Sequence, residues 1–184
     1  MKHAWSRRRR RLADAKTIWG YAVLWGSSTN IANEFLEQFA KGSLTRSIRE
    51  DDIRMLLDHD PGRVVGRTAS GSLRLREDAL GLRYEVDVNL DTPDGQTLAG
   101  TIGRRDVSGI SPSFYVKTEN WLDGGSGLPL RIITEARLRE ISAVAWPAYP
   151  QTTAVMRSIA NTNSVAAQRR IAARREAMRV RGML

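Results

Sequence analysis

The sequence predicts a mainly β protein with flanking helices, an α+β class, on three observations. Short segments rich in β-branched and aromatic residues recur at close spacing along the chain. Residues 82–89 (LRYEVDVN) alternate apolar and polar side chains, which is the period of a strand with one buried face. Only two or three segments carry helix signals. Many short strands with few helices favour a small barrel or sandwich with helices packed outside.

In the first half of the chain, residues 17–25 (TIWGYAVLW) predict the first strand. Asn33 is a candidate N-cap for a short helix that ends near Gly42. Residues 45–60 allow either one helix or a helix followed by a strand. Three further strands are expected at 63–70, 73–77 and 82–89.

The second half begins with a helix, for which Thr92 is the predicted N-cap and Pro93 the first helical residue. This helix should reach about Arg105. The segment DVSGISPSFY then places Ser111 between Gly109 and Pro112, which predicts a kink that presents the serine hydroxyl. Further extended segments are expected at 113–121, 130–136 and 138–145.

The positive charge of the chain is concentrated in two tails. The net charge is +9, of which residues 1–16 carry +6, residues 157–184 carry +6 and residues 17–156 carry −3. We therefore expect a disordered basic leader (1–16), one globular domain (17–156), and a polar linker with a basic helical tail (157–184) that is removable. No apolar run is long enough to span a membrane, and the leader lacks the apolar region of a secretory signal.

A serine nucleophile needs a base, and the chain offers two histidines. His3 lies in the basic leader, so His59 is the natural partner of Ser111, with Lys41 and Lys117 as weaker candidates. The α/β-hydrolase fold is excluded because its histidine follows the serine. The absence of cysteine excludes thiol catalysis and thiolate metal sites, and no cofactor is expected.

Short motifs spread from residue 20 to about residue 153 resemble the prohead maturation proteases of tailed bacteriophages, serine peptidases similar in fold to herpesvirus assemblins. The motifs are, in order, GYA (20–22), FAKGSL (39–44), LLDHD (56–60), GR (66–67), SGISPSF (108–114), LREIS (138–142) and PAYP (147–150). The chain departs from the family at Pro112-Ser113, where an aromatic–glycine pair is commoner. The resemblance implies a small assemblin-like β-barrel with helices packed outside.

The resemblance also implies roles for three residues. Ser111 would attack the scissile carbonyl, and His59 would take its proton and pass it to the leaving amine. Glu140, in LREIS, would orient His59 from a strand face shared with Leu138. Asp60 and Asp106 are its rivals as the third member. Backbone N–H groups near Ser111, with Arg137 or Arg139, are candidate oxyanion donors.

The resemblance implies an endopeptidase that cleaves the phage scaffold protein, the major capsid protein and itself, in the procapsid interior or the host cytoplasm, and it leaves a homo-oligomer open. A different class of function is a nucleic-acid-binding or structural capsid component that uses its basic tails without catalysis. The acidic core speaks against nucleic acid there, since its aromatic residues lie in strand patterns rather than among basic residues. An inactive homologue is a third alternative.

Overall fold

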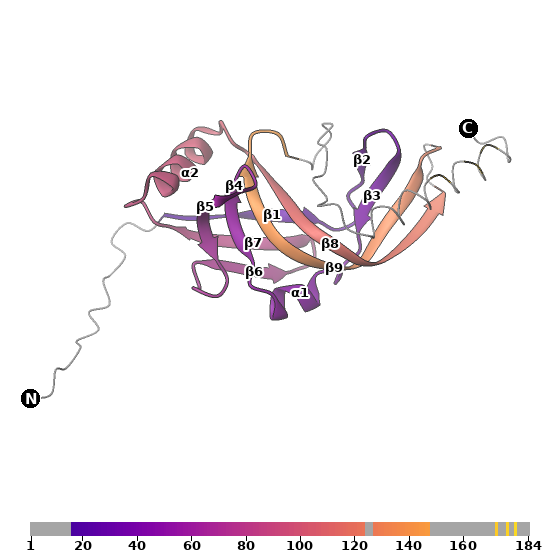
Figure 1. Cartoon of the computed structure of the whole chain (residues 1–184), viewed down its shortest axis with the longest axis horizontal. Coiled ribbons are helices and arrows are strands. Elements are labelled where there is room, and N and C mark those ends of the chain that lie inside the picture. Colours follow the sequence, from indigo (N-terminus) through magenta and orange to yellow (C-terminus); the bar gives the residue numbers. More distant parts are fainter. Residues whose placement is uncertain (1–15, 124–126, 148–171, 173–175, 177–178, 180–184) are drawn as a thin grey trace, which may run out of the picture.

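A computed structural model of the 184-residue chain describes residues 16–123, 127–147, 172, 176 and 179. From residue 16 to residue 147, the described part forms nine strands and two helices, arranged as a three-stranded sheet beside a six-stranded sheet (Figure 1). This confirms the predicted α+β class. The expected closure into a barrel is wrong, because no ladder of hydrogen bonds joins the edges of the two sheets in this part of the chain.

The three-stranded sheet has one apolar and one charged face. It runs in the order β1 (Lys16–Leu24), β7 (Gly81–Val88) and β6 (Leu73–Glu77), with antiparallel pairing throughout. Along β7 the apolar side chains are buried, while Glu85 and Asp87 pair with Arg74 of β6 on the other face. The alternation read from residues 82–89 therefore predicted both the strand and its buried side.

The six-stranded sheet is organised around one long strand, β9 (Pro129–Val144). β8 (Gly109–Asp123) pairs with it antiparallel along its whole length. On the opposite edge, β3 (Phe35–Phe39) pairs parallel with the first part of β9, and β4 (Arg54–Leu57) pairs parallel with the last part. β2 (Thr29–Ile31) and β5 (Asp60–Arg67) complete the sheet outside β3 and β4. The two strands expected at 130–136 and 138–145 are thus one.

The helix expected after Asn33 is absent, since this segment forms the β2–β3 hairpin. Asn33 has a φ of 58° and lies in the connecting loop with Ala32, whose φ is 52°. The burial of Phe35, Glu37 and Phe39 alternates with the half-burial of the residues between them. The same apolar residues fit a helix over five positions, and pairing with β9 decides for the strand.

The two helices flank the sheets. α1 (Thr45–Glu50) precedes β4, so residues 45–60 form a helix and then a strand. α2 (Pro93–Arg104) connects β7 to β8 and lies at the end of the molecule that carries β4 and β5 (Figure 1). Its predicted cap is confirmed, because the Thr92 hydroxyl accepts a hydrogen bond from the N–H of Gly95 at 3.1 Å.

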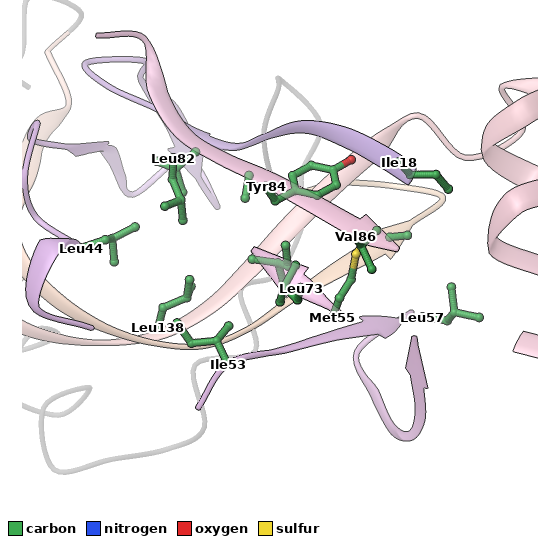
Figure 2. Packing of buried hydrophobic residues seen from close by; sticks show 14 of the residues in the cluster. Ile18, Leu44, Ile53, Met55, Leu57, Leu73, Leu82, Tyr84, Val86 and Leu138 are labelled. Atoms are coloured by element: carbon green, nitrogen blue, oxygen red, sulfur yellow. The ribbon is translucent and has the colours of Figure 1, made fainter. Parts of the chain in front are cut away.

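The hydrophobic core lies between the two sheets (Figure 2). Tyr84 and Val86 of β7 face it from one side, and Met55 and Leu57 of β4 face it from the other. The last part of β9 adds two further residues from the six-stranded sheet, Ile141 and Ala143. One face of the six-stranded sheet therefore packs against the core. The alternate side chains of β4, β9 and β8 point to the opposite face.

Most of the predicted leader, linker and tail lies outside the described residues. Of the tail, Ala172, Glu176 and Arg179 are helical, and Arg179 pairs with Glu176 at 3.1 Å. No helix in the described ranges is long and apolar enough to cross a membrane.

Candidate active site

The site is built on the face of the six-stranded sheet that points away from the core. Because Ile141 and Ala143 face the core, the alternation of β9 puts Glu140 and Ser142 on the opposite face. The pairing of β8 with β9 shifts between Ser113 and Phe114, which lie opposite Glu140 and Leu138. One additional residue, Arg139, is thereby inserted into β9 as a bulge.

This bulge reverses the side on which residues before it point. Leu138 belongs to the core cluster, although it is only two positions from Glu140. The expectation that Glu140 shares a face with Leu138 is therefore wrong. A β-bulge of this kind commonly changes the direction of a side chain near an active site. Here Leu138 faces the core while the Glu140 carboxylate lies on the opposite face of the sheet.

His59 is delivered by the tight turn between β4 and β5. Leu57 pairs with Asp60, so Asp58 and His59 form a two-residue loop, with φ values of 49° and 58°. Two positive φ values in succession are typical of the hairpin turn whose twist matches that of its strands. The loop is tied to β9, because the N–H of Asp58 donates to the carbonyl of Ala143 at 3.1 Å.

The imidazole of His59 contacts the carboxylate of Glu140. Nδ1 of His59 lies 2.6 Å from Oε1 of Glu140. The second carboxylate oxygen, Oε2, accepts a hydrogen bond from the Ser142 hydroxyl at 2.6 Å. The His59 side chain is 35% exposed and that of Glu140 only 8%. The site thus has a buried carboxylate beneath a solvent-accessible imidazole.

The chemistry of these groups fixes the hydrogen-bond roles. An ionised carboxylate only accepts, so His59 donates through Nδ1–H to Glu140. The other ring nitrogen, Nε2, then carries the lone pair and is the atom able to accept a proton. A carboxylate that accepts from one ring nitrogen and leaves the other nitrogen free is the arrangement in which a histidine acts as a general base.

Ser111 lies on β8 next to these groups, but not in a kink. It is the third residue of β8 and pairs with Ser142. Directly paired residues of antiparallel strands have Cα atoms about 4.5–5.5 Å apart and side chains on the same face. The Ser111 hydroxyl therefore belongs to the face on which His59 contacts Glu140.

Ser111 is largely enclosed by its neighbours and lies in a strand, not in the predicted kink. The residue is 5% exposed, and within the described ranges its hydroxyl makes no hydrogen bond. Pro112 fits inside the strand because, in the described part of the chain, β8 pairs only with β9 and one of its edges needs no N–H donor. Pro147 packs so closely against residue 109 that only glycine fits there, because an added Cβ would lie 2.2–2.7 Å from the proline ring.

The rival carboxylates are engaged elsewhere. Asp60 Oδ1 accepts the N–H of Gly62 at 2.8 Å, and Asp106 forms an exposed ion pair with Arg104 at 3.2 Å. Among the alternative bases, Lys41 and Lys117 are both exposed.

The candidate oxyanion donors differ in their surroundings. Arg137 binds Glu50 at 2.7 Å and also binds Asp51, so its guanidinium is held beside α1. Arg139 is exposed at the bulge.

The sequence reasoning missed one serine of the site, Ser142, and a neighbouring serine, Ser113, that lies beside the site without a hydrogen bond to its side chains in the described ranges. Ser113 pairs with Glu140 two positions after Ser111, on the same face of β8. Ser142 is fully buried and contacts Glu140 directly. The alternation of LREIS could have placed Ser142 beside Glu140, but its contact with His59 depends on the parallel pairing of β4 with β9.

The described residues contain no group of three or more acidic or histidine side chains arranged to hold a metal ion. No curated protein and no solved structure matches the chain. The family described as caudovirus prohead serine protease matches residues 5–165 of the 184. The match spans both sheets and the cluster of His59, Glu140 and Ser111, and the chain belongs to this family of phage prohead serine peptidases.

Proposed function

We propose that the protein is a serine endopeptidase of procapsid maturation in which Ser111 is the nucleophile, His59 the general base and Glu140 the carboxylate that orients His59. Membership of the prohead serine protease family supports the peptidase activity. The observation that carries the residue assignment is the 2.6 Å contact between Nδ1 of His59 and Glu140 on the face that also bears Ser111. It leaves Nε2 as the proton acceptor.

The reaction follows from these roles. Oγ of Ser111 attacks the scissile carbonyl carbon while Nε2 of His59 takes the hydroxyl proton. The C–N bond then breaks, and the imidazolium returns that proton to the leaving amine. A water molecule, activated by the same nitrogen, hydrolyses the resulting ester and regenerates Ser111. Glu140 stays ionised throughout and stabilises the imidazolium.

The substrates we propose are the scaffold protein and the major capsid protein of the same phage, inside the procapsid or in the host cytoplasm. The family to which the chain belongs acts on proheads, and this supports such partners. Co-expression of the full chain with both proteins tests the proposal. Mass spectrometry should find cleaved products with the wild type and none with Ser111→Ala.

Ser113→Ala is the matched control, because it removes a hydroxyl from the same face two positions away. It should retain cleavage. Uncut partners with the wild type, or cleavage by purified Ser111→Ala, would overturn the assignment of Ser111.

We further propose self-cleavage between about residues 149 and 168. The polar segment 158–164 and the arginine-rich segment after it support this on sequence grounds, since such a tail can dock on an acidic partner and then be released. Intact-mass measurement should show loss of the tail in the wild type and not in Ser111→Ala. Loss from both proteins would point to another protease.

A further inference from the structure

A third contact joins the site to the backbone of the β4–β5 turn. The hydroxyl of Ser142 accepts a hydrogen bond from the backbone N–H of His59 at 3.2 Å while it donates to Oε2 of Glu140 at 2.6 Å. His59 in turn contacts Oε1 of the same carboxylate at 2.6 Å. Ser142, Glu140 and His59 therefore form a closed ring of three contacts. Ser142 is the only one of the three that touches no solvent, with an exposure of 0%.

The ring acts on the backbone of His59. In a two-residue hairpin loop, the turn hydrogen bond joins the residues on either side, so the N–H groups of the two loop residues take no part in it. Here both are bound by β9, because Asp58 donates to the Ala143 carbonyl and His59 donates to Ser142. His59 also has a φ of 58°, a region that non-glycine residues occupy only when their surroundings hold them there. The hydrogen bond to the Ser142 hydroxyl is thus one of two that hold the loop backbone from which the His59 side chain extends.

The ring also acts on the carboxylate. Glu140 is 6% exposed, and a buried carboxylate needs a donor for each oxygen. Ser142, two residues along β9 and on the same face, occupies Oε2 and thereby leaves Oε1 for the imidazole. Without this donor, the contact of Oε1 with His59 would be the one hydrogen bond left to the carboxylate among the described residues. One hydroxyl therefore restrains both partners of the His59–Glu140 contact.

We infer that Ser142 is a positioning residue that aligns the imidazole of His59 with the Glu140 carboxylate. This inference rests on the proposed peptidase function for its kinetic consequences. The alignment itself is a property of the fold, and it can be measured without turnover. Ser142 acts through His59 and Glu140, not on the substrate.

The chain contains a matched control in Ser47 of α1. Ser47 is also 0% exposed, accepts a backbone N–H from Leu138 at 2.7 Å and donates to the Asp51 carboxylate at 2.7 Å. Ser47→Ala and Ser142→Ala therefore remove the same two kinds of hydrogen bond from equally buried positions. Only the second substitution touches the His59–Glu140 pair.

The kinetic test measures the rate at which a fluorophosphonate labels the full-length protein, since this reaction needs an activated serine but no known substrate. Ser142→Ala should slow labelling on the order of tenfold to hundredfold, the scale of a misplaced catalytic group. Ser47→Ala should label within about twofold of the wild type, and Ser142→Thr, which keeps a hydroxyl, should recover most of the lost rate. Equal rates for Ser142→Ala and the wild type, or equal losses in the two alanine variants, would refute the inference.

A spectroscopic test separates this inference from the peptidase assignment. In the Ser111→Ala background, the Nδ1 proton of His59 should give a low-field NMR resonance. Ser142→Ala should shift or broaden it, and Ser47→Ala should leave it in place. If the wild type does not label at all, the peptidase proposal fails while the resonance still decides the role of Ser142.

The fold of each variant is checked by denaturant unfolding. If Ser142→Ala is unfolded, Ser142→Cys takes its place, since a thiol fills the site and donates only weakly. An unchanged resonance in a folded variant lacking the hydroxyl would contradict the inference.

Discussion

At the scale of single residues, the site depends on one buried carboxylate with two donors. Glu140 accepts from Nδ1 of His59 and from Ser142, whereas Asp60 is occupied by the N–H of Gly62. The sequence suggested Ser111 from the segment between Gly109 and Pro112, and His59 by elimination, because His3 is the only other histidine. The choice of Glu140 over Asp60 and Asp106 came from the resemblance of LREIS to the family motif and not from the residue pattern itself. In the structure the choice depends on which strand lies beside β4, and this pairing joins residues more than eighty positions apart.

Glu140→Gln should lower the rate of peptide cleavage on the order of 10²- to 10⁴-fold, and less than loss of Ser111 or His59. An amide cannot stabilise the imidazolium as a carboxylate does, but the nucleophile and the base remain. Cleavage kinetics with a peptide that the wild type cuts provide the measurement.

Asp60→Asn is the control for this substitution and should stay near the wild-type rate. A crippled Asp60→Asn protein together with a fully active Glu140→Gln protein would require that the two roles be exchanged.

At the scale of elements, the predictions from pattern succeeded where one strand or helix decides its own structure. The alternation of β7 and the cap of α2 were read correctly from their residues. The kink predicted at Ser111 was wrong. In the described part of the chain Pro112 lies in a strand that pairs only with β9, and Gly109 permits a close contact with Pro147. The bulge at Arg139 carries no signal in LREIS, since it arises from the pairing of β8 with β9.

Gly109→Ala tests the packing that supports the start of β8. The added methyl group would lie 2.2–2.7 Å from the ring of Pro147, so the strand or the proline must move. We expect a loss of about 1–3 kcal/mol in the free energy of unfolding, with slower fluorophosphonate labelling of Ser111 two residues away.

Gly100→Ala is the matched substitution in α2, where a Cβ meets nothing within 4 Å. It should raise stability by about 0.5–1 kcal/mol, because alanine is the better helix former. Denaturant unfolding of both variants provides the comparison, and similar shifts in the two would contradict the role given to Gly109.

At the scale of the whole molecule, the class was predictable and the arrangement was not. Period-two patterns predict strands with one buried face, and these strands make the two sheets that enclose the core (Figure 2). Whether the strands close into a barrel depends on their order and on the pairing of the sheet edges. Both are set by long-range pairing, much of it with β9. The parallel pairing of β3 and β4 with β9 cannot be read from any of the three segments alone.

The core also predicts a loss of stability in alkali. Tyr84 is 4% exposed, and burial raises its pKa to about 12, well above the usual value of a tyrosine. Above pH 10 the unfolded chain therefore loses a proton that the folded protein keeps. The free energy of unfolding should fall between pH 10 and about pH 12, by an amount on the order of 2 kcal/mol from this residue.

Tyr84→Phe removes this titration and should show the smaller decline over the same range. The comparison is made by denaturant unfolding at pH 9, 10, 11 and 12. Parallel curves for the two proteins would show that Tyr84 ionises as easily in the folded state as in the unfolded one.

Peptide mapping of a covalent adduct gives a direct chemical test of Ser111 as a nucleophile activated by His59. The full-length protein is reacted with a fluorophosphonate, digested and analysed by mass spectrometry, with His59→Ala and Ser113→Ala treated in parallel. We expect one adduct on Ser111 in the wild type and in Ser113→Ala, and little or none in His59→Ala. An adduct on Ser113, or equally fast labelling of Ser111 without His59, would contradict this expectation.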